Sequence, residues 1–236
     1  LMGLVSVRSF VADDAVREAA RRVELRLWNH LADGWHRGSR ELSGPHSRAY
    51  SVRMGFSWVA VLLYRATAGE LDWPQAPVGE FLQVASLIQD VELPDEIRTR
   101  FTGPTVRREI DEPGEAHPAG ESVRRTRYHT ALTDQWTIGS VDLQDSRTDR
   151  QNLLAYWQTA EPNLDGQGSG YLILRTRTER DEGAFGLYVA AAQAGGDVLA
   201  ALFPSEFDDP SPMRPRDGAD TEHTFELERE TAPGRI

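Results

Sequence analysis

The sequence predicts an α+β protein, with an N-terminal helical bundle followed by a mixed domain that holds an antiparallel sheet. Apolar residues recur at three- and four-residue steps in the first hundred residues, whereas later segments are rich in β-forming residues. A stretch containing Gly103-Pro104 and Pro113-Gly114 separates the two parts. We therefore divide the chain into a helical bundle (1–101), a Pro/Gly-rich linker or long hairpin loop (102–120), and an antiparallel-sheet domain with one helix and an acidic, Pro-rich tail (121–236).

The segment from Val11 to Trp35 has the pattern of one amphipathic helix. Its polar side offers Asp13 with Arg17, and Glu18 with Arg22, as pairs four residues apart. The spacing predicts that one apolar side faces the core, formed by Val16, Ala20, Val23, Leu27, Leu31 and Trp35.

Three further helices complete the predicted bundle. The second runs from Ser47 to about Ala68, and its centre is apolar nearly all round, so we expect it to be buried. This centre is too short to cross about 30 Å of hydrocarbon. Pro77 can open a third helix, and residues 94–101 a short fourth one. Within the second helix, the residues expected in the interior are Val59, Leu62 and Leu63.

The second half reads as strands around one helix. We expect Val106–Ile110 and Ser122–Leu132 to flank the Pro/Gly-rich stretch if that stretch is a hairpin loop. The remaining expected elements are a strand at 136–141, a helix at 145–160, a hairpin of 171–178 with 184–192, a short helix at 197–202, an irregular stretch at 203–218 and an edge strand at 224–227.

Composition excludes several classes of chemistry. The chain has no cysteine, which removes disulfides, thiolate nucleophiles and cysteine-containing metal sites. All 26 basic residues are arginine, so a lysine Schiff base or a P-loop lysine is also excluded. The net charge of −11 falls mostly on residues 102–236, which carry 14 arginines and 24 acids. The first ten residues lack the long apolar run of a secretory signal, so we expect a cytoplasmic protein that is not bound to a membrane.

Sequence motifs typical of catalytic or metal sites match this chain only in part. Gly55-Phe56-Ser57-Trp58-Val59 carries half of a nucleophile elbow and lies inside a predicted helix. The glycine-rich segment 163–170 resembles a calcium loop only in part, because Leu174 stands where an EF-hand has glutamate. A hydrolase with a dispersed His and carboxylate site stays open. For a metal site of His and carboxylate ligands from distant segments, the pairs to inspect first are Glu115 with His117 and His223 with Glu226. We expect no cofactor and no metal.

Arginines in the second half form a candidate nucleic-acid surface. In extended strands, Arg125 and Arg127 share one side with His129, and Arg175 shares a side with Arg177. If their two strands were neighbours, these residues would make a cationic stripe, with Tyr128 and Tyr171 available to stack on bases. The net charge of this region opposes binding of a polyanion.

Elimination therefore favours a non-enzymatic interaction or assembly protein, a subunit of a larger intracellular complex or particle. Its partners would be other protein subunits, including copies of itself, because the chain has six tryptophans to act as interface anchors and an acidic, Pro-rich tail. The alternatives are a nucleic-acid-associated factor that uses the arginine stripe, and the hydrolase described above.

Overall fold

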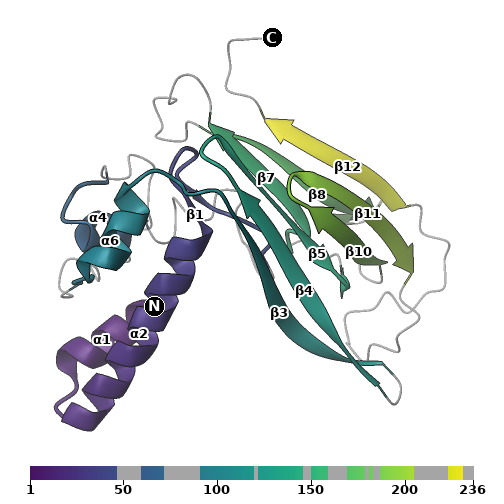
Figure 1. The fold of residues 1–236 in the computed structure, drawn as a ribbon. Helices are drawn as coiled ribbons and strands as arrows, with labels where there is room; N and C mark the ends of the chain where they lie inside the picture. The colour runs from purple at the N-terminus through teal and green to yellow at the C-terminus, as the bar shows by residue number, and fades with distance from the viewer. Residues whose placement is uncertain are drawn as a thin grey trace.

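The computed structural model confirms the α+β class, with helices at the N-terminus followed by antiparallel sheets (Figure 1). It describes residues 1–46, 60–71, 91–119, 122–145, 150–158, 169–178, 181–182, 187–204 and 223–230. The helices gather on one side of the molecule and the strands on the other. None of the helices in these ranges combines the length and the apolar character needed to cross a bilayer.

Helices α1 (Met2–Phe10) and α2 (Asp14–Gly34) form an antiparallel hairpin. Asp13 caps α2 by accepting hydrogen bonds from the backbone N–H groups of residues 15 and 16 at 2.8 and 3.0 Å. The predicted pair of Asp13 with Arg17 is therefore wrong, and Arg17 binds Asp14 instead. The pair of Glu18 with Arg22 is confirmed at 3.6 Å.

The buried side of α2 differs from the side that its apolar pattern predicted. Val16 and Val23 are 45% and 49% exposed, and the buried residues are Ala20, Glu24, Trp28 and Ala32. A carboxylate can lie on this side because Arg8 of α1 reaches it, with 2.6 Å between Arg8 Nε and Glu24 Oε2.

The remaining described helices share one apolar core with α1 and α2. In the second predicted helix, the described part is α4 (Ala60–Ala66); Leu62 and Leu63 are buried as expected, while Val59 and the start at Ser47 lie outside the described residues. The third predicted helix also lies outside them. The fourth is confirmed as α6 (Asp95–Thr102), whose Phe101 packs edge-on against Trp28 and Trp35.

Within the described residues, most strands belong to one antiparallel sheet of seven, with the order β12-β8-β7-β5-β4-β3 and with β9 paired to β8. A two-stranded ribbon, β1 (Trp35–His36) with β2 (Glu41–Leu42), follows α2. The strands of the large sheet are β3 (Arg108–Ala119), β4 (Ser122–Leu132), β5 (Trp136–Asp142), β7 (Leu153–Gln158), β8 (Ser169–Thr178), β9 (Asp181–Glu182) and β12 (His223–Glu230).

A second sheet of three strands, in the order β11-β10-β6, packs against the first through β10 and β5. Leu143, at φ 63°, turns the chain from β5 into β6 (Gln144–Asp145). Gln193 of β10 (Leu187–Ala194) fixes the two sheets together, because its amide donates to the carbonyl of Ile138 at 3.1 Å and accepts from Ser140 Oγ at 2.8 Å. β11 (Asp197–Pro204) ends this sheet.

The Pro/Gly-rich stretch is largely a strand rather than a linker or a loop. β3 pairs with β4 along its length, with an irregularity between Pro113 and Ala116 that includes Gly114, and Pro118 lies in register opposite Val123. β3 lies at an edge of the sheet, where a proline costs no ladder hydrogen bond. The strands expected at 136–141 and at the 224–227 edge are confirmed as β5 and β12.

The helix expected at 145–160 is wrong, because residues 153–158 form β7. Leu154 and Tyr156 are fully buried on one face, and Leu153, Ala155 and Trp157 are half-buried on the other. A strand covered on both faces is apolar without alternation, so its sequence also satisfies a helical spacing.

The short helix and the hairpin predicted within residues 171–202 are also wrong. Residues 197–202 are not a helix but part of β11, which pairs with β10 through a turn at Gly195 and Gly196, where Gly195 has φ 56°. The expected hairpin of 171–178 with 184–192 does not form, since β7, β12 and β9 pair with β8. Of the stretch expected to be irregular, residues 205–218 lie outside the described residues.

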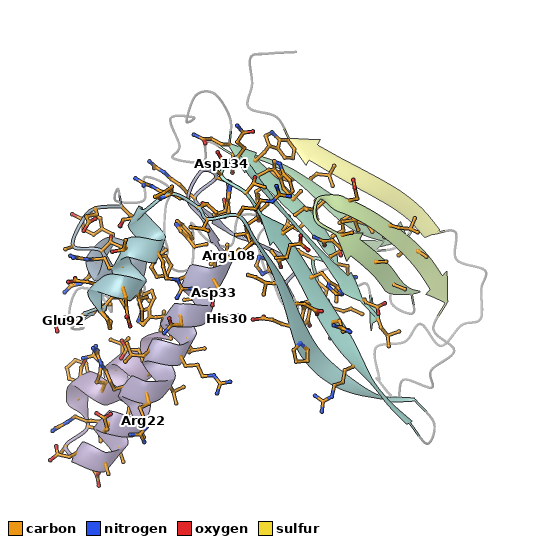
Figure 2. The ribbon with its side chains drawn as sticks, viewed as in Figure 1. Arg22, His30, Asp33, Glu92, Arg108 and Asp134 are labelled. Carbon is orange, nitrogen blue, oxygen red and sulfur yellow. The ribbon has the colours of Figure 1, made fainter. Side chains whose placement is uncertain are left out.

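Arginine side chains fasten the end of α2 to β3 and to α6 (Figure 2). Arg108 of β3 donates to the carbonyl oxygen of Ala32 at 2.9 Å, and Arg100 of α6 donates to Asn29 Oδ1 at 2.8 Å and binds Asp33. Burial lowers the pKa of Arg108 below its ordinary range. Both cations lie at the carboxyl end of α2, where they interact favourably with the helix dipole, and Arg108 joins this end of α2 to β3.

Candidate functional site

The structure does not bring the predicted arginine stripe together. β5 and β7 separate β4 from β8, so the two arginine strands lie about 14 Å apart at ordinary strand spacing. By alternation, Arg127 and His129 lie on one face of the sheet, while positions 175 and 177 share the face of Ile173, which is the opposite one.

The individual residues of that stripe have other surroundings. Arg127 forms an ion pair with Asp111 of β3, and His129 Nδ1 lies 3.7 Å from the same carboxylate. Arg125 is exposed. Tyr128 donates its hydroxyl hydrogen bond to Gln144, and Tyr171 is buried within the sheet core, where no base can stack on it. The stripe as a continuous nucleic-acid surface is therefore not formed.

The two histidine–carboxylate pairs predicted from the sequence are not part of the described site. The side chains of Glu115, His117, His223 and Glu226 lie outside the described ones. Among the described residues, no group of three or more His, Asp or Glu side chains is arranged to hold a metal ion.

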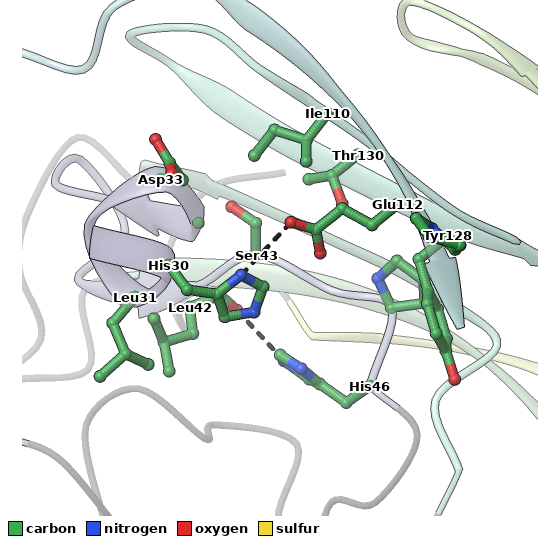
Figure 3. A pocket seen from close by; sticks show the side chains of 13 residues that line it. His30, Leu31, Asp33, Leu42, Ser43, His46, Ile110, Glu112, Tyr128 and Thr130 are labelled. Carbon is green, nitrogen blue, oxygen red and sulfur yellow. Dashed lines mark hydrogen bonds and ion pairs between the residues drawn. The ribbon is translucent and has the colours of Figure 1, made fainter. Parts of the chain in front are cut away.

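A pocket with a volume of about 330 Å³ lies where the end of α2 and residues 42–46 face β3 and β4 (Figure 3). His30 of α2 and Glu112 of β3 extend toward each other across it, with 3.3 Å between His30 Nδ1 and Glu112 Oε1. Both side chains are partly exposed, at 59% and 42%. The other described lining residues are Leu31, Asp33, Gly34, Leu42, Ser43, Pro45, His46, Ile110, Pro113, Tyr128 and Thr130.

Close packing of backbone on sheet holds residues 42–46 at this pocket. A Cβ on Gly139 of β5 would overlap the carbonyl oxygen of Gly44, so only glycine permits this approach. The same carbonyl accepts a hydrogen bond from Thr130 Oγ1 at 2.7 Å. His46 pairs by its backbone with Gln151, and its ring is close to the pocket. Sequence spacing gives no sign of these contacts, because they join residues 86 or more positions apart.

The hairpin of β10 and β11 presents a surface of a different kind. Asp197 is the one charged residue among the 18 residues from Leu187 to Pro204, although 27% of the whole chain is charged. On the outer face, Leu199 is 77% exposed. Around it lie the exposed alanines Ala192, Ala194 and Ala201.

β11 also forms an edge of its sheet. One side of the strand pairs with β10 along eight residues, and no strand among the described residues pairs with the other side. Alternate N–H and C=O groups of β11 therefore point away from β10, and within β11 no residue after Asp197 is charged. The helix expected at 197–202 would not have formed this edge, so the surface was not predicted. The feature of the sequence that indicates this surface is the near absence of charged residues in 187–204.

Comparison with protein-family models, with curated proteins and with solved structures finds no match to this chain.

Proposed function

We propose that this chain is an interaction protein that assembles through the β10–β11 hairpin, and that the first partner on this surface is a second copy of the chain. The observation that carries the proposal is the edge strand β11, which has no charged residue after its first, Asp197, and in which Leu199 is 77% exposed. Monomeric proteins usually protect such an edge with charges, prolines or a covering segment.

Charge favours a second copy at this surface. The chain carries a net charge of −11, so most approaches between two copies are repulsive. The hairpin has one charged residue, at the start of β11, and this surface is therefore where two copies meet least repulsion. Apolar, charge-poor surface is also what the centre of a homodimer interface usually contains.

Antiparallel pairing of β11 with β11 of the second copy gives a closed assembly. In such a pair, residues on the same face oppose each other, for example Leu199 of one copy and Ala201 of the other. The two three-stranded sheets would then form one continuous sheet. Because the pairing uses the β11 edge of both copies, it ends at a two-fold dimer and does not propagate. A larger complex would need a second surface.

Size-exclusion chromatography with light scattering tests the proposal by measuring the mass of the full chain. Because the fraction of dimer rises with protein concentration, the chain is measured at up to about 0.1 mM. We expect a dimer for the unmodified protein and a monomer for Leu199→Arg, because each copy would place a cation against Ala201 of the other copy, diagonal to the cation of its symmetry mate. Val106→Arg is the matched control, since Val106 is another exposed apolar residue, at 67%, outside the hairpin. Circular dichroism verifies that both variants are folded.

A monomer for the unmodified protein at this concentration would refute self-association. A dimer that survives Leu199→Arg would place the interface elsewhere. The nucleic-acid alternative receives no comparable support, because its arginines lie on separated strands and Arg127 is paired with Asp111.

A further inference from the structure

The pocket between α2 and the β3–β4 hairpin presents many hydrogen-bond acceptors and few donors. Two of its hydroxyl groups donate their protons to groups of the protein. Thr130 Oγ1 donates to the carbonyl of Gly44 at 2.7 Å, and the Tyr128 hydroxyl donates to Gln144 Oε1 at 3.0 Å. A hydroxyl that donates in this way keeps lone pairs on its oxygen and has no further proton to offer.

His46 adds another acceptor. Its Nε2 lies 3.3 Å from the carbonyl oxygen of Leu42 and therefore carries the proton that it donates. Burial lowers the pKa of His46 to about 4, so the ring is neutral near pH 7 and Nδ1 keeps its lone pair. The Oγ of Ser43, which also lines the pocket, is buried and has no hydrogen-bond partner among the described residues.

Glu112 supplies negative charge at the same place. One of its oxygens faces His30, and the carboxylate stays partly exposed toward the pocket. The chain has no lysine, and no arginine is among the described residues that line the pocket. Two arginines approach the lining residue Asp33: Arg100 binds it, and Arg108, 4.0 Å away, donates to the carbonyl oxygen of Ala32. A ligand that supplies several N–H donors and a positive charge would match these groups.

We infer that this pocket binds a primary alkylammonium group, with the cation at Glu112 and the alkyl chain against Leu31, Leu42 and Ile110. The ammonium carries three donors, which suit the carboxylate and the surrounding lone pairs. The three apolar side chains line the pocket from α2, β2 and β3. Its volume of about 330 Å³ is at the lower end of the range for small-ligand sites.

The site is independent of the proposed dimer, because none of its described residues belongs to β10 or β11. The alkylammonium has two possible sources: a free amine or a lysine side chain of another protein. Both present the same chemistry, and the length of the probe distinguishes them.

Titration calorimetry or ligand-observed NMR with n-hexylamine on the full chain tests the inference. We expect hexylamine to bind at least about 10-fold more tightly than n-hexanol, which has the same alkyl chain without the charge. Glu112→Gln should weaken hexylamine binding by about 10-fold or more and leave hexanol binding unchanged. The matched control is Glu109→Gln, because Glu109 is an exposed carboxylate on the same strand and does not line the pocket.

Equal binding of hexylamine and hexanol would overturn the inference, as would equal losses in Glu112→Gln and Glu109→Gln. Unchanged thermal midpoints verify that each variant is folded. The second arm compares hexylamine with an acetylated, amidated lysine peptide. Tighter binding of the peptide assigns the site to a lysine of a protein partner, and tighter binding of hexylamine assigns it to a free amine. No binding of either probe would also refute the inference.

Discussion

The ion pair between Arg8 of α1 and Glu24 of α2 allows a quantitative test of how the helical hairpin is held. The Glu24 side chain is fully buried and that of Arg8 is 16% exposed, with 2.6 Å between Arg8 Nε and Glu24 Oε2. Trp28 Nε1 donates to the other carboxylate oxygen at 3.3 Å. Replacing Arg8 by methionine keeps most of the apolar stem but leaves the carboxylate with one neutral donor.

We expect Arg8→Met to lower the free energy of unfolding by about 3–5 kcal/mol, the usual cost of an uncompensated buried charge. The double variant Arg8→Met with Glu24→Met removes both charges from the interior. Its stability should return close to that of the unmodified protein or exceed it, since the desolvation cost of two ions disappears. Urea denaturation followed by tryptophan fluorescence measures all three free energies, because Trp28 lies beside the pair.

The exposed pair of Glu18 and Arg22 on the same helix is the control. These side chains are 64% and 66% exposed and lie 3.6 Å apart, so Arg22→Met should cost less than about 1 kcal/mol. If Arg8→Met costs no more than Arg22→Met, the carboxylate is not desolvated as described. A double variant less stable than Arg8→Met alone would also contradict the reasoning.

Three further predictions concern the core, the buried imidazoles and the backbone. Leu63→Ala should destabilise by about 2–5 kcal/mol in urea denaturation, because Leu63 is 1% exposed in the helical core; a loss below about 1 kcal/mol would contradict its position. Burial lowers the pKa of His36 from 6.5 to about 4, so the unfolded chain binds more protons between these values and stability falls as the pH falls through this window. The free energy of unfolding should fall by up to about 3 kcal/mol through this window. The His36→Gln variant should lose correspondingly less stability when unfolding is measured between pH 7 and 4. Gly139→Ala should destabilise strongly, because its Cβ would overlap the carbonyl oxygen of Gly44, whereas Gly3→Ala meets no neighbouring atom and should not; equal melting temperatures for the two variants would refute the close approach.

Local pattern predicted those elements whose sequence fits one kind of structure. The length and spacing of the segment from Val11 to Trp35 predicted the helix found at 14–34, and local rules predicted at 94–101 the helix found at 95–102; the cap at Asp13 was not predicted. The spacing of apolar residues predicted a helix wrongly in two strands. In β7 both faces of the segment are covered, and in β11 a short apolar run suits either helix or strand. The composition excluded thiol and lysine chemistry, and the structure leaves that conclusion unchanged.

The tertiary structure decided which surfaces are buried and which residues meet. Sequence rules place Glu24 outside the core, but Arg8 from another helix neutralises it, and the buried side of α2 turns away from Val16 and Val23. His30 and Glu112 are 82 positions apart in sequence and meet only because α2 lies against β3. Helix and strand formation depends on neighbours along the chain, whereas burial and the composition of a pocket depend on contacts between distant segments. The sequence alone therefore determined the α+β class and the excluded chemistry, and the packing of α2 and β10 on the sheet decided the candidate surfaces.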